Sequence, residues 1–211
     1  MNTAQMDFWK GQFGKDYTER NTLTIEELNQ DSLDKYGFSR EEMNARFLGG
    51  IDVNNILEVG CNVGLQLQQL QKSGYNNLFG IELQSYAVEK AKQISTQINI
   101  IQGSAFDIPF KDNYFDLTFT SGVLIHIAPE DINQALDEIY RVSKRYIWGF
   151  EYYSEVDQQL EYRGYEQKMW KMDYMKVYLN RFPNLSVVKV ENYKYKNSNN
   201  MDQMFLLEKL N

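Results

Sequence analysis

From about residue 54 onward, short apolar runs alternate with segments that repeat apolar residues at helical spacing. The segment 132–140, for example, places Ile, Ala, Leu, Ile and Tyr side chains on one face of a helix. Because the runs are apolar without a strict period of two, they predict buried strands of a parallel sheet with helices on both faces. The predicted strands are 56–59, 78–82, 98–101, 114–120 and 145–152.

Both ends of the chain depart from this alternation. The first fifty residues predict helices, since residues 24–27 and 39–42 match capping boxes. The segment 154–183 is polar and aromatic, and it predicts a helix over 167–179. We therefore expect a helical lid at 1–50 and a core at 51–211, with 154–183 as an insertion on the substrate side.

The C-terminal segments 185–195 and 201–209 read as two further strands with a short polar loop between them. A short loop joins antiparallel neighbours, so the last strand is expected to run against the others. The predicted fold is therefore α/β, with a seven-stranded mixed sheet that ends in an antiparallel C-terminal hairpin.

Composition excludes several classes of protein. The 211 residues carry a net charge of −7, which argues against a protein that tracks nucleic-acid phosphates. No apolar run is long enough for a membrane span, and the N-terminus lacks the order of a signal peptide, so we expect a cytoplasmic protein. With one cysteine and one histidine, a transition-metal site built from protein ligands is not expected.

Two carboxylates stand where neighbouring predicted strands end. Glu58 precedes the glycine turn 60–64, and Glu82 closes the next strand. An acid before the first glycine would repel a phosphate, but it suits a cationic or amine-bearing ligand. A carboxylate at the position of Glu82 can accept hydrogen bonds from both ribose hydroxyls.

The glycine turn with Glu58 and Glu82 resembles the S-adenosylmethionine site of class I methyltransferases, which have a Rossmann-like fold and release S-adenosylhomocysteine. Asn62 stands where that family often has glycine, and Asn tolerates positive φ better than most residues. In the loop 103–110, Ser104 replaces the usual acid, and Leu83 and Phe106 would enclose the adenine. The resemblance implies these cofactor-binding residues: Trp9, Tyr17, Arg20, Glu58, Gly60, Cys61, Asn62, Glu82, Leu83, Ser104, Ala105, Phe106, Thr120 and Ser121.

Within that class, the segments 8–21, 122–127, 151–153 and 162–164 are similar to the pseudaminic acid biosynthesis-associated methylases. The resemblance implies a small-molecule acceptor, a sugar or nonulosonic-acid-type metabolite, with Tyr153 and Arg163 as substrate contacts. Arg163 would hold a carboxylate or phosphate; a solvated loop is the alternative. The oligomeric state stays open between monomer and homodimer.

Two roles at the centre of the site have plainer alternatives. Trp9, Phe13 and Tyr17 share one helical face, followed by Arg20, and we expect a lid in which Arg20 or Tyr17 binds the methionine carboxylate. A packed amphipathic helix is the alternative. His126 is the only side chain whose unperturbed pKa suits a general base at neutral pH, which favours O-methylation. A structural histidine is the alternative.

Two other functions fit parts of the pattern. A nicotinamide-dependent oxidoreductase would use a similar fold, but it predicts a different glycine spacing and no acid directly before the turn. A non-catalytic module that keeps the cofactor site would match every motif, and only an activity assay separates it from an enzyme.

Overall fold

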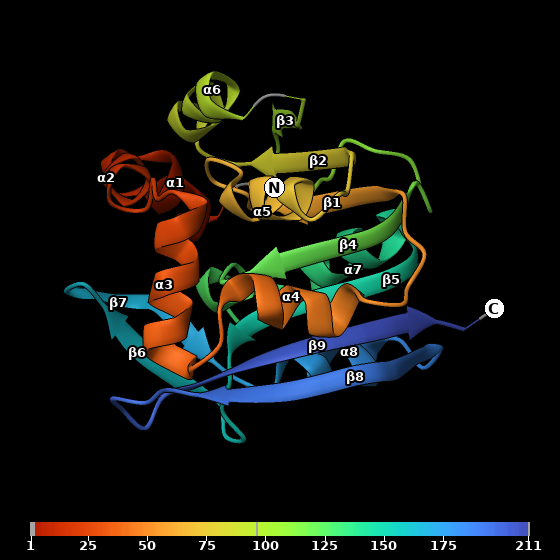
Figure 1. The fold of residues 1–211 in the computed structure, drawn as a ribbon. Coiled ribbons are helices and arrows are strands. Elements are labelled where there is room, and N and C mark those ends of the chain that lie inside the picture. Colours follow the sequence, from red (N-terminus) through yellow and green to blue (C-terminus); the bar gives the residue numbers. More distant parts are fainter. Residues whose placement is uncertain (1–2, 96, 211) are drawn as a thin grey trace.

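The computed structural model describes residues 3–95 and 97–210 and contains a seven-stranded sheet between two layers of helices (Figure 1). The order is β3-β2-β1-β4-β5-β9-β8, in which β9 runs antiparallel to β5 and β8. The predicted mixed sheet and C-terminal hairpin are confirmed. Its strands are β1 (Asn55–Val59), β2 (Asn77–Glu82), β3 (Asn99–Gln102), β4 (Phe115–Ser121), β5 (Ser143–Tyr152), β8 (Leu185–Lys194) and β9 (Met201–Lys209).

Alternating side chains of each strand build a separate core on each face of the sheet. In β9, Met204 and Leu206 pack on one face, and Phe205 and Leu207 pack on the other. The first core contains residues of α4 (Arg40–Leu48), α5 (Leu65–Lys72) and α6 (Ser85–Ile94); the second contains residues of α7 (Ile132–Val142) and α8 (Tyr174–Arg181). No helix of the described residues is long and apolar enough to cross a membrane.

The N-terminal segment forms four helices. They are α1 (Ala4–Lys10), α2 (Gln12–Arg20), α3 (Ile25–Tyr36) and α4, and the two predicted capping boxes are present at α3 and α4. The chain leaves helical geometry at Gly11, so Trp9 and Tyr17 lie on two short helices. α4 contributes buried residues to the core. Residues 1, 2, 96 and 211 of the predicted lid and core lie outside the described residues.

The helix predicted over 167–179 is wrong in its first half. The chain instead forms a two-stranded hairpin, β6 (Gln158–Tyr162) and β7 (Tyr165–Lys171), and a helix begins only at α8. Arg163 and Gly164 both have positive φ and make the turn. The side chain of Asp173 accepts a hydrogen bond from the Lys176 backbone N–H, and this N-cap sets the start of α8.

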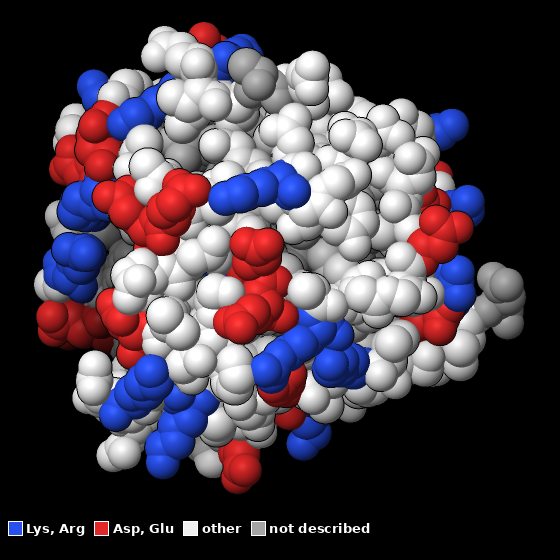
Figure 2. Space-filling view, in the orientation of Figure 1, with Lys and Arg blue, Asp and Glu red and all other residues white. Residues whose placement is uncertain are grey.

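Charged side chains of both signs are interspersed on the face that carries α3, α4 and α5 (Figure 2). One ion pair there joins Arg46 of α4 to Glu191 of β8 at 2.9 Å. Because both side chains are partly exposed, the pair contributes little to stability. Stability of this layer therefore rests on the apolar contacts beneath it.

Gly149 in β5 lets the ring of Phe205 on β9 pack directly against the β5 backbone in the sheet's second core. A Cβ at this position would lie 2.2 Å from the ring of Phe205 on β9. We expect Gly149→Ala to destabilise the protein by about 1–3 kcal/mol through overpacking, which lowers the melting temperature by roughly 2–10 °C. Differential scanning calorimetry measures the shift.

The double variant Gly149→Ala/Phe205→Leu is the control, because the smaller side chain relieves the clash. Its loss should be less than the sum of the two single losses. Additive losses would contradict the proposed steric contact.

Candidate functional site

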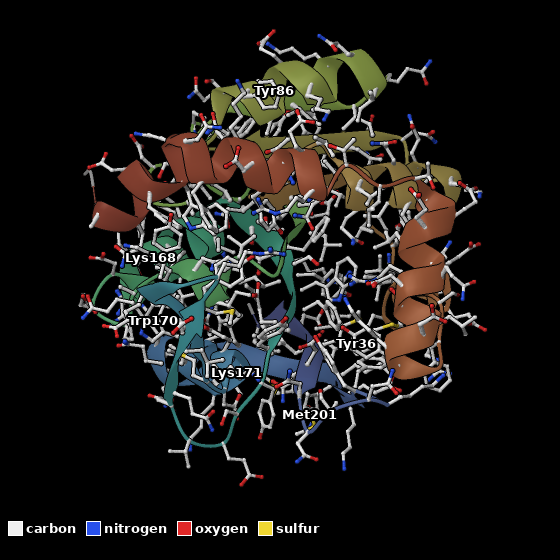
Figure 3. All side chains as sticks on the ribbon, turned by 90° about the vertical axis from the view of Figure 1, so that its left-hand side faces the viewer. Tyr36, Tyr86, Lys168, Trp170, Lys171 and Met201 are labelled. Carbon is white, nitrogen blue, oxygen red and sulfur yellow. The ribbon has the colours of Figure 1, made fainter. Side chains whose placement is uncertain are left out.

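A cavity of about 570 Å³ lies at the edge where the parallel strands end. Its lining comes from the loops after β1 to β4, from the end of β5, from α1 to α4, from the β6–β7 hairpin and from the start of β9. Figure 3 faces this edge, with α6 at the top, α1 and α2 below it, β6–β7 at lower left and α3 at right. The volume is in the range of small-molecule sites.

The glycine turn after β1 is fixed by hydrogen bonds from the neighbouring strand. The backbone N–H groups of Gly60 and Cys61 donate to the Ile81 carbonyl at 2.8 and 3.0 Å. Asn62 has φ of 48°, which confirms that asparagine adopts the positive φ expected there. Its backbone N–H donates to Glu82 Oε2 at 2.8 Å, so the turn and the carboxylate orient one another.

Glu82 is held at both of its oxygens. The Gln84 backbone N–H donates to Oε1 at 2.8 Å, while Asn62 donates to Oε2. Burial raises the pKa of Glu82, and these backbone hydrogen bonds oppose the rise. Each oxygen keeps lone pairs for further donors in the cavity, as a vicinal diol would supply.

Glu58 and Arg40 are oppositely charged residues buried in the cavity lining, at 3% and 6% exposure. Glu58 Oε2 has no hydrogen-bond partner, and neither has Arg40 Nε. Burial raises the pKa of Glu58 well above that of an ordinary carboxyl, and the Arg40 charge opposes this. These two side chains therefore give the site an unpartnered acceptor and an unpartnered donor.

Arg40 is positioned by its neighbours as well as by its charge. Its Nη1 donates to Ser121 Oγ at 3.3 Å, and its guanidinium lies 4.2 Å from the centre of the Phe150 ring. Sequence reasoning missed Arg40, because an arginine at the start of a capped helix is usually solvated. Only the packing of α4 against the sheet buries it.

Aromatic rings close the cavity from the side of the N-terminal helices. The Trp9 ring lies 5.2 Å from Tyr17 and 4.6 Å from His126, and His126 lies 4.9 Å from Tyr162 (ring centres). The α1–α2 segment and the β6–β7 hairpin thus meet over the end of β4. The Gln84 side chain holds the end of α1 in place, because its amide nitrogen lies within 3.1 Å of the backbone carbonyl oxygens of residues 9–11 and donates to them.

His126 is neutral in this environment. Its Nδ1 lies 2.8 Å from the Lys168 carbonyl oxygen, which requires a proton on Nδ1 and leaves the lone pair on Nε2. Burial lowers the pKa of His126 to about 4. The ring is therefore free to accept a proton at neutral pH, but it is a weaker base than an exposed histidine.

Glu151, at 2% exposure, is a second buried acid of the lining that the candidate set omits. It accepts hydrogen bonds from the Val123 and Ile125 backbone N–H groups at 3.2 and 3.5 Å. Burial raises the pKa of Glu151 to about 7. These bonds make Glu151 the support of the loop that carries His126.

The structure brings most of the predicted site residues into the cavity lining. Those that line it are Trp9, Tyr17, Glu58, Gly60, Cys61, Asn62, Glu82, Leu83, Ser104, Ala105, Phe106, Ser121, His126 and Arg163. Arg20, Thr120 and Tyr153 do not. Arg20 is the last residue of α2, and its guanidinium lies 5.7 Å from the centre of the Phe13 ring. Thr120 is buried beside Glu151, and Tyr153 lies one residue beyond β5.

Other lining residues were absent from the candidate set. They are Tyr36, Arg40, Gln84, Glu151, Tyr152, Tyr162, Tyr195 and Asp202 among others. Glu151, Tyr152 and Tyr162 stand in segments that the sequence comparison with the methylase family singles out, which is the signal that could have found them. Tyr36, Tyr195 and Asp202 carry no such signal.

Residues 57–146 match a protein family described as "Methyltransferase domain". A sterol 24-C-methyltransferase of Pneumocystis carinii is 32% identical over 95 residues, 42% of this chain. The matched part spans a quarter of that relative's length. The matched relatives therefore support a methyltransferase domain in the central part of the chain.

Solved structures with the same fold cover nearly the whole chain. A SAM-dependent methyltransferase of Leishmania major matches with a TM-score of 0.71 at 16% identity, over 98% of this chain and 87% of that one. A 1,6-didemethyltoxoflavin-N1-methyltransferase of Burkholderia thailandensis, solved with S-adenosylhomocysteine, gives 0.68 at 11% identity over the same shares. The fold is the Rossmann-like class I methyltransferase fold. Family match and fold together support a SAM-dependent methyltransferase.

The single histidine permits a direct test of the site's electrostatics. We expect an NMR titration of the His126 ring to show a midpoint near pH 4, well below that of a free histidine, because burial disfavours the charged ring. Since the unfolded state binds this proton first, His126 should lower stability as pH falls from 6.5 towards 4 and leave it unchanged above. A midpoint near 6.5 would mean that the ring is solvated.

Proposed function

We propose that this chain is a SAM-dependent methyltransferase acting on a small-molecule acceptor, a sugar or nonulosonic-acid-type metabolite that is methylated on oxygen. The observation that carries the proposal is the pair of carboxylates, Glu58 and Glu82, at the ends of β1 and β2 in one cavity. Both lie inside the matched methyltransferase domain. The sugar-like acceptor rests on the resemblance of residues 8–21 and 162–164 to the pseudaminic acid-associated methylases.

The residues present fit the nucleoside part of S-adenosylmethionine. Glu82 would accept hydrogen bonds from the two ribose hydroxyls, since its oxygens are already oriented by backbone donors. Leu83 and Phe106 line the next part of the cavity and would enclose the adenine. The Ala105 backbone N–H and the Ser104 hydroxyl are the polar groups of that loop.

The residues also fit the charged end of the cofactor. Arg40 has a buried Nε without a partner and would bind the methionine carboxylate, the role that the sequence analysis assigned to Arg20 or Tyr17. Glu58 Oε2 would accept from the ammonium group. A bound cation beside Glu58 lowers its pKa again, so binding favours the ionised carboxylate.

When bound, the cofactor supplies a methyl group already activated on a sulfonium sulfur. The chain's own contribution is alignment and exclusion of water: α1 and α2 cover the cavity, and the Trp9 and Tyr17 rings offer faces to a cation. Arg163, in the turn of the β6–β7 hairpin, would hold an acidic group of the acceptor. His126 Nε2 would receive the hydroxyl proton, which its neutral ring permits.

Cofactor binding is the first test. We expect S-adenosylhomocysteine at about 100 times its Kd to stabilise the protein by ~2.7 kcal/mol, which raises the melting temperature by roughly 5–10 °C. NAD at the same concentration is the control and should cause no shift. A shift with NAD and none with S-adenosylhomocysteine would overturn the proposed function.

A pair of arginine variants tests the assignment of the methionine carboxylate. We expect Arg40→Gln to weaken S-adenosylhomocysteine binding at least about tenfold, ~1.4 kcal/mol, because the buried donor is lost. Arg20→Gln is the matched control and should bind within about twofold of wild type, since Arg20 does not line the cavity. Isothermal titration calorimetry measures both affinities.

The reverse order of the two effects would return the role to Arg20. The melting temperature of Arg40→Gln without ligand is measured in parallel, because this side chain also contacts Ser121 and Phe150. A folded variant with unchanged affinity contradicts the role of Arg40.

A further inference from the structure

The cavity lining contains a further carboxylate, Asp202, that none of the proposed cofactor contacts uses. Asp202 is the second residue of β9, and its side chain is 3% exposed. Because β9 runs antiparallel to β5, its start lies at the same edge where β5 ends, directly opposite Tyr152. The hairpin thereby brings a residue from the end of the chain into the site.

Two tyrosine hydroxyls donate hydrogen bonds to one oxygen of this carboxylate, and the other oxygen has no partner. Tyr36 at the end of α3 donates to Asp202 Oδ2 at 2.5 Å, and Tyr195 just after β8 donates to the same oxygen at 3.1 Å. Oδ1 is buried without a partner. All three side chains line the cavity, and Tyr36 and Met201 mark this region in Figure 3.

An unpartnered carboxylate oxygen in a buried site is costly, and a hydrogen-bond donor from a ligand would satisfy it. Burial raises the pKa of Asp202 to about 6, while the two tyrosine hydroxyls and the charges of Arg40 and Lys35 oppose the rise. The positive charge of Lys171 in β7 also interacts with the charge of Asp202. The carboxylate is therefore largely ionised at neutral pH.

Asp202 lies away from the strands that the cofactor would occupy. β9 is one strand beyond β5 and two beyond β4, and strands are ~4.8 Å apart, so its backbone is roughly 10 Å from that of Ser121. Glu58 on β1 is a further strand away. The proposed contacts to the nucleoside and the ammonium group lie at the ends of β1, β2 and β3, and Arg40 reaches the cavity from α4 beside Phe150 of β5. The β9 end of the cavity is left to a second ligand.

We propose that Asp202 is a specificity-determining residue for the methyl acceptor, whose hydroxyl or ammonium group donates a hydrogen bond to Oδ1. This inference rests on the proposed function, because it assigns the second ligand of that site. The hydrogen bonds from Tyr36 and Tyr195 fix the orientation of the carboxylate, so Oδ1 has a defined direction towards the acceptor. Polyhydroxylated and amino-bearing molecules supply such donors, whereas purely apolar acceptors do not.

A structural role alone would use only the clamped oxygen. Tyr36, Tyr195 and Asp202 join α3 to the β8–β9 hairpin, and that link needs Oδ2 but not Oδ1. Asp202→Asn separates the two roles, since the amide oxygen still accepts from both tyrosines while an NH2 group replaces Oδ1.

The experiment measures the binding of N-acetylglucosamine, glucosamine and N-acetylneuraminic acid to the S-adenosylhomocysteine-loaded protein by ligand-observed NMR. We expect at least one probe to bind the wild type and to bind Asp202→Asn at least tenfold more weakly, with S-adenosylhomocysteine affinity unchanged. Glucosamine and N-acetylglucosamine distinguish an ammonium donor from a hydroxyl donor.

Asp116→Asn is the matched control. Asp116 Oδ2 accepts hydrogen bonds from the backbone N–H groups of Asn54 and Asn55, at 3.0 Å each, and Asp116 lies outside the cavity lining. Its substitution also removes one carboxylate charge and should leave probe binding unchanged. A similar loss in Asp116→Asn would mean that the effect is one of charge or stability.

The possible outcomes distinguish a failure of the role of Asp202 from a failure of the proposed methyltransferase function. If S-adenosylhomocysteine does not bind the wild type, the proposed function fails and this inference fails with it. If S-adenosylhomocysteine binds but no probe does, or if Asp202→Asn keeps wild-type probe affinity or loses S-adenosylhomocysteine affinity, the role of Asp202 alone is overturned.

Discussion

The burial of Glu58 at the end of β1 with one oxygen unpartnered is the constraint on which the site depends. An ionised carboxylate in such a place is stable only when opposite charge or a ligand compensates it. Arg40 supplies opposite charge from α4, and it too keeps a nitrogen without a partner. The molecule therefore holds two unsatisfied groups of opposite character beside one cavity, at a cost that a zwitterionic ligand would offset.

The cover over this cavity follows from the same arrangement. α1 and α2 are short, and Gly11 separates them, so neither would be a stable helix alone. They are held by aromatic contacts to the β6–β7 hairpin and by Gln84, which stands two residues after Glu82. Gln84, which holds α1 over the cavity, is thus in the same loop as the carboxylate proposed to bind the ribose.

The antiparallel hairpin at the end of the sheet widens the site. In an all-parallel sheet only the loops that follow strands reach the carboxyl edge, but β9 brings its own first residues there. Asp202 and Tyr152 consequently face the cavity from neighbouring strands. The sheet order, with β4 and β5 between β1 and β9, places Glu58 and Asp202 three strands apart at the same edge of the sheet.

Local pattern determined the sheet, its mixed topology and the capped helices α3 and α4, because buried strands, hairpins and capping boxes are specified by residues close in sequence. It also located Glu58, Asn62 and Glu82, since a strand end followed by a glycine turn is a local signal. The β6–β7 hairpin was not predicted, because apolar residues such as Met169 and Trp170 are buried by tertiary contacts rather than by helical spacing. The site also contains Arg40, Tyr36 and Asp202, which reach it only because α3, α4 and β9 pack at one edge of the sheet. Residues close in sequence do not specify which distant side chains the fold brings together, so these three could not be predicted.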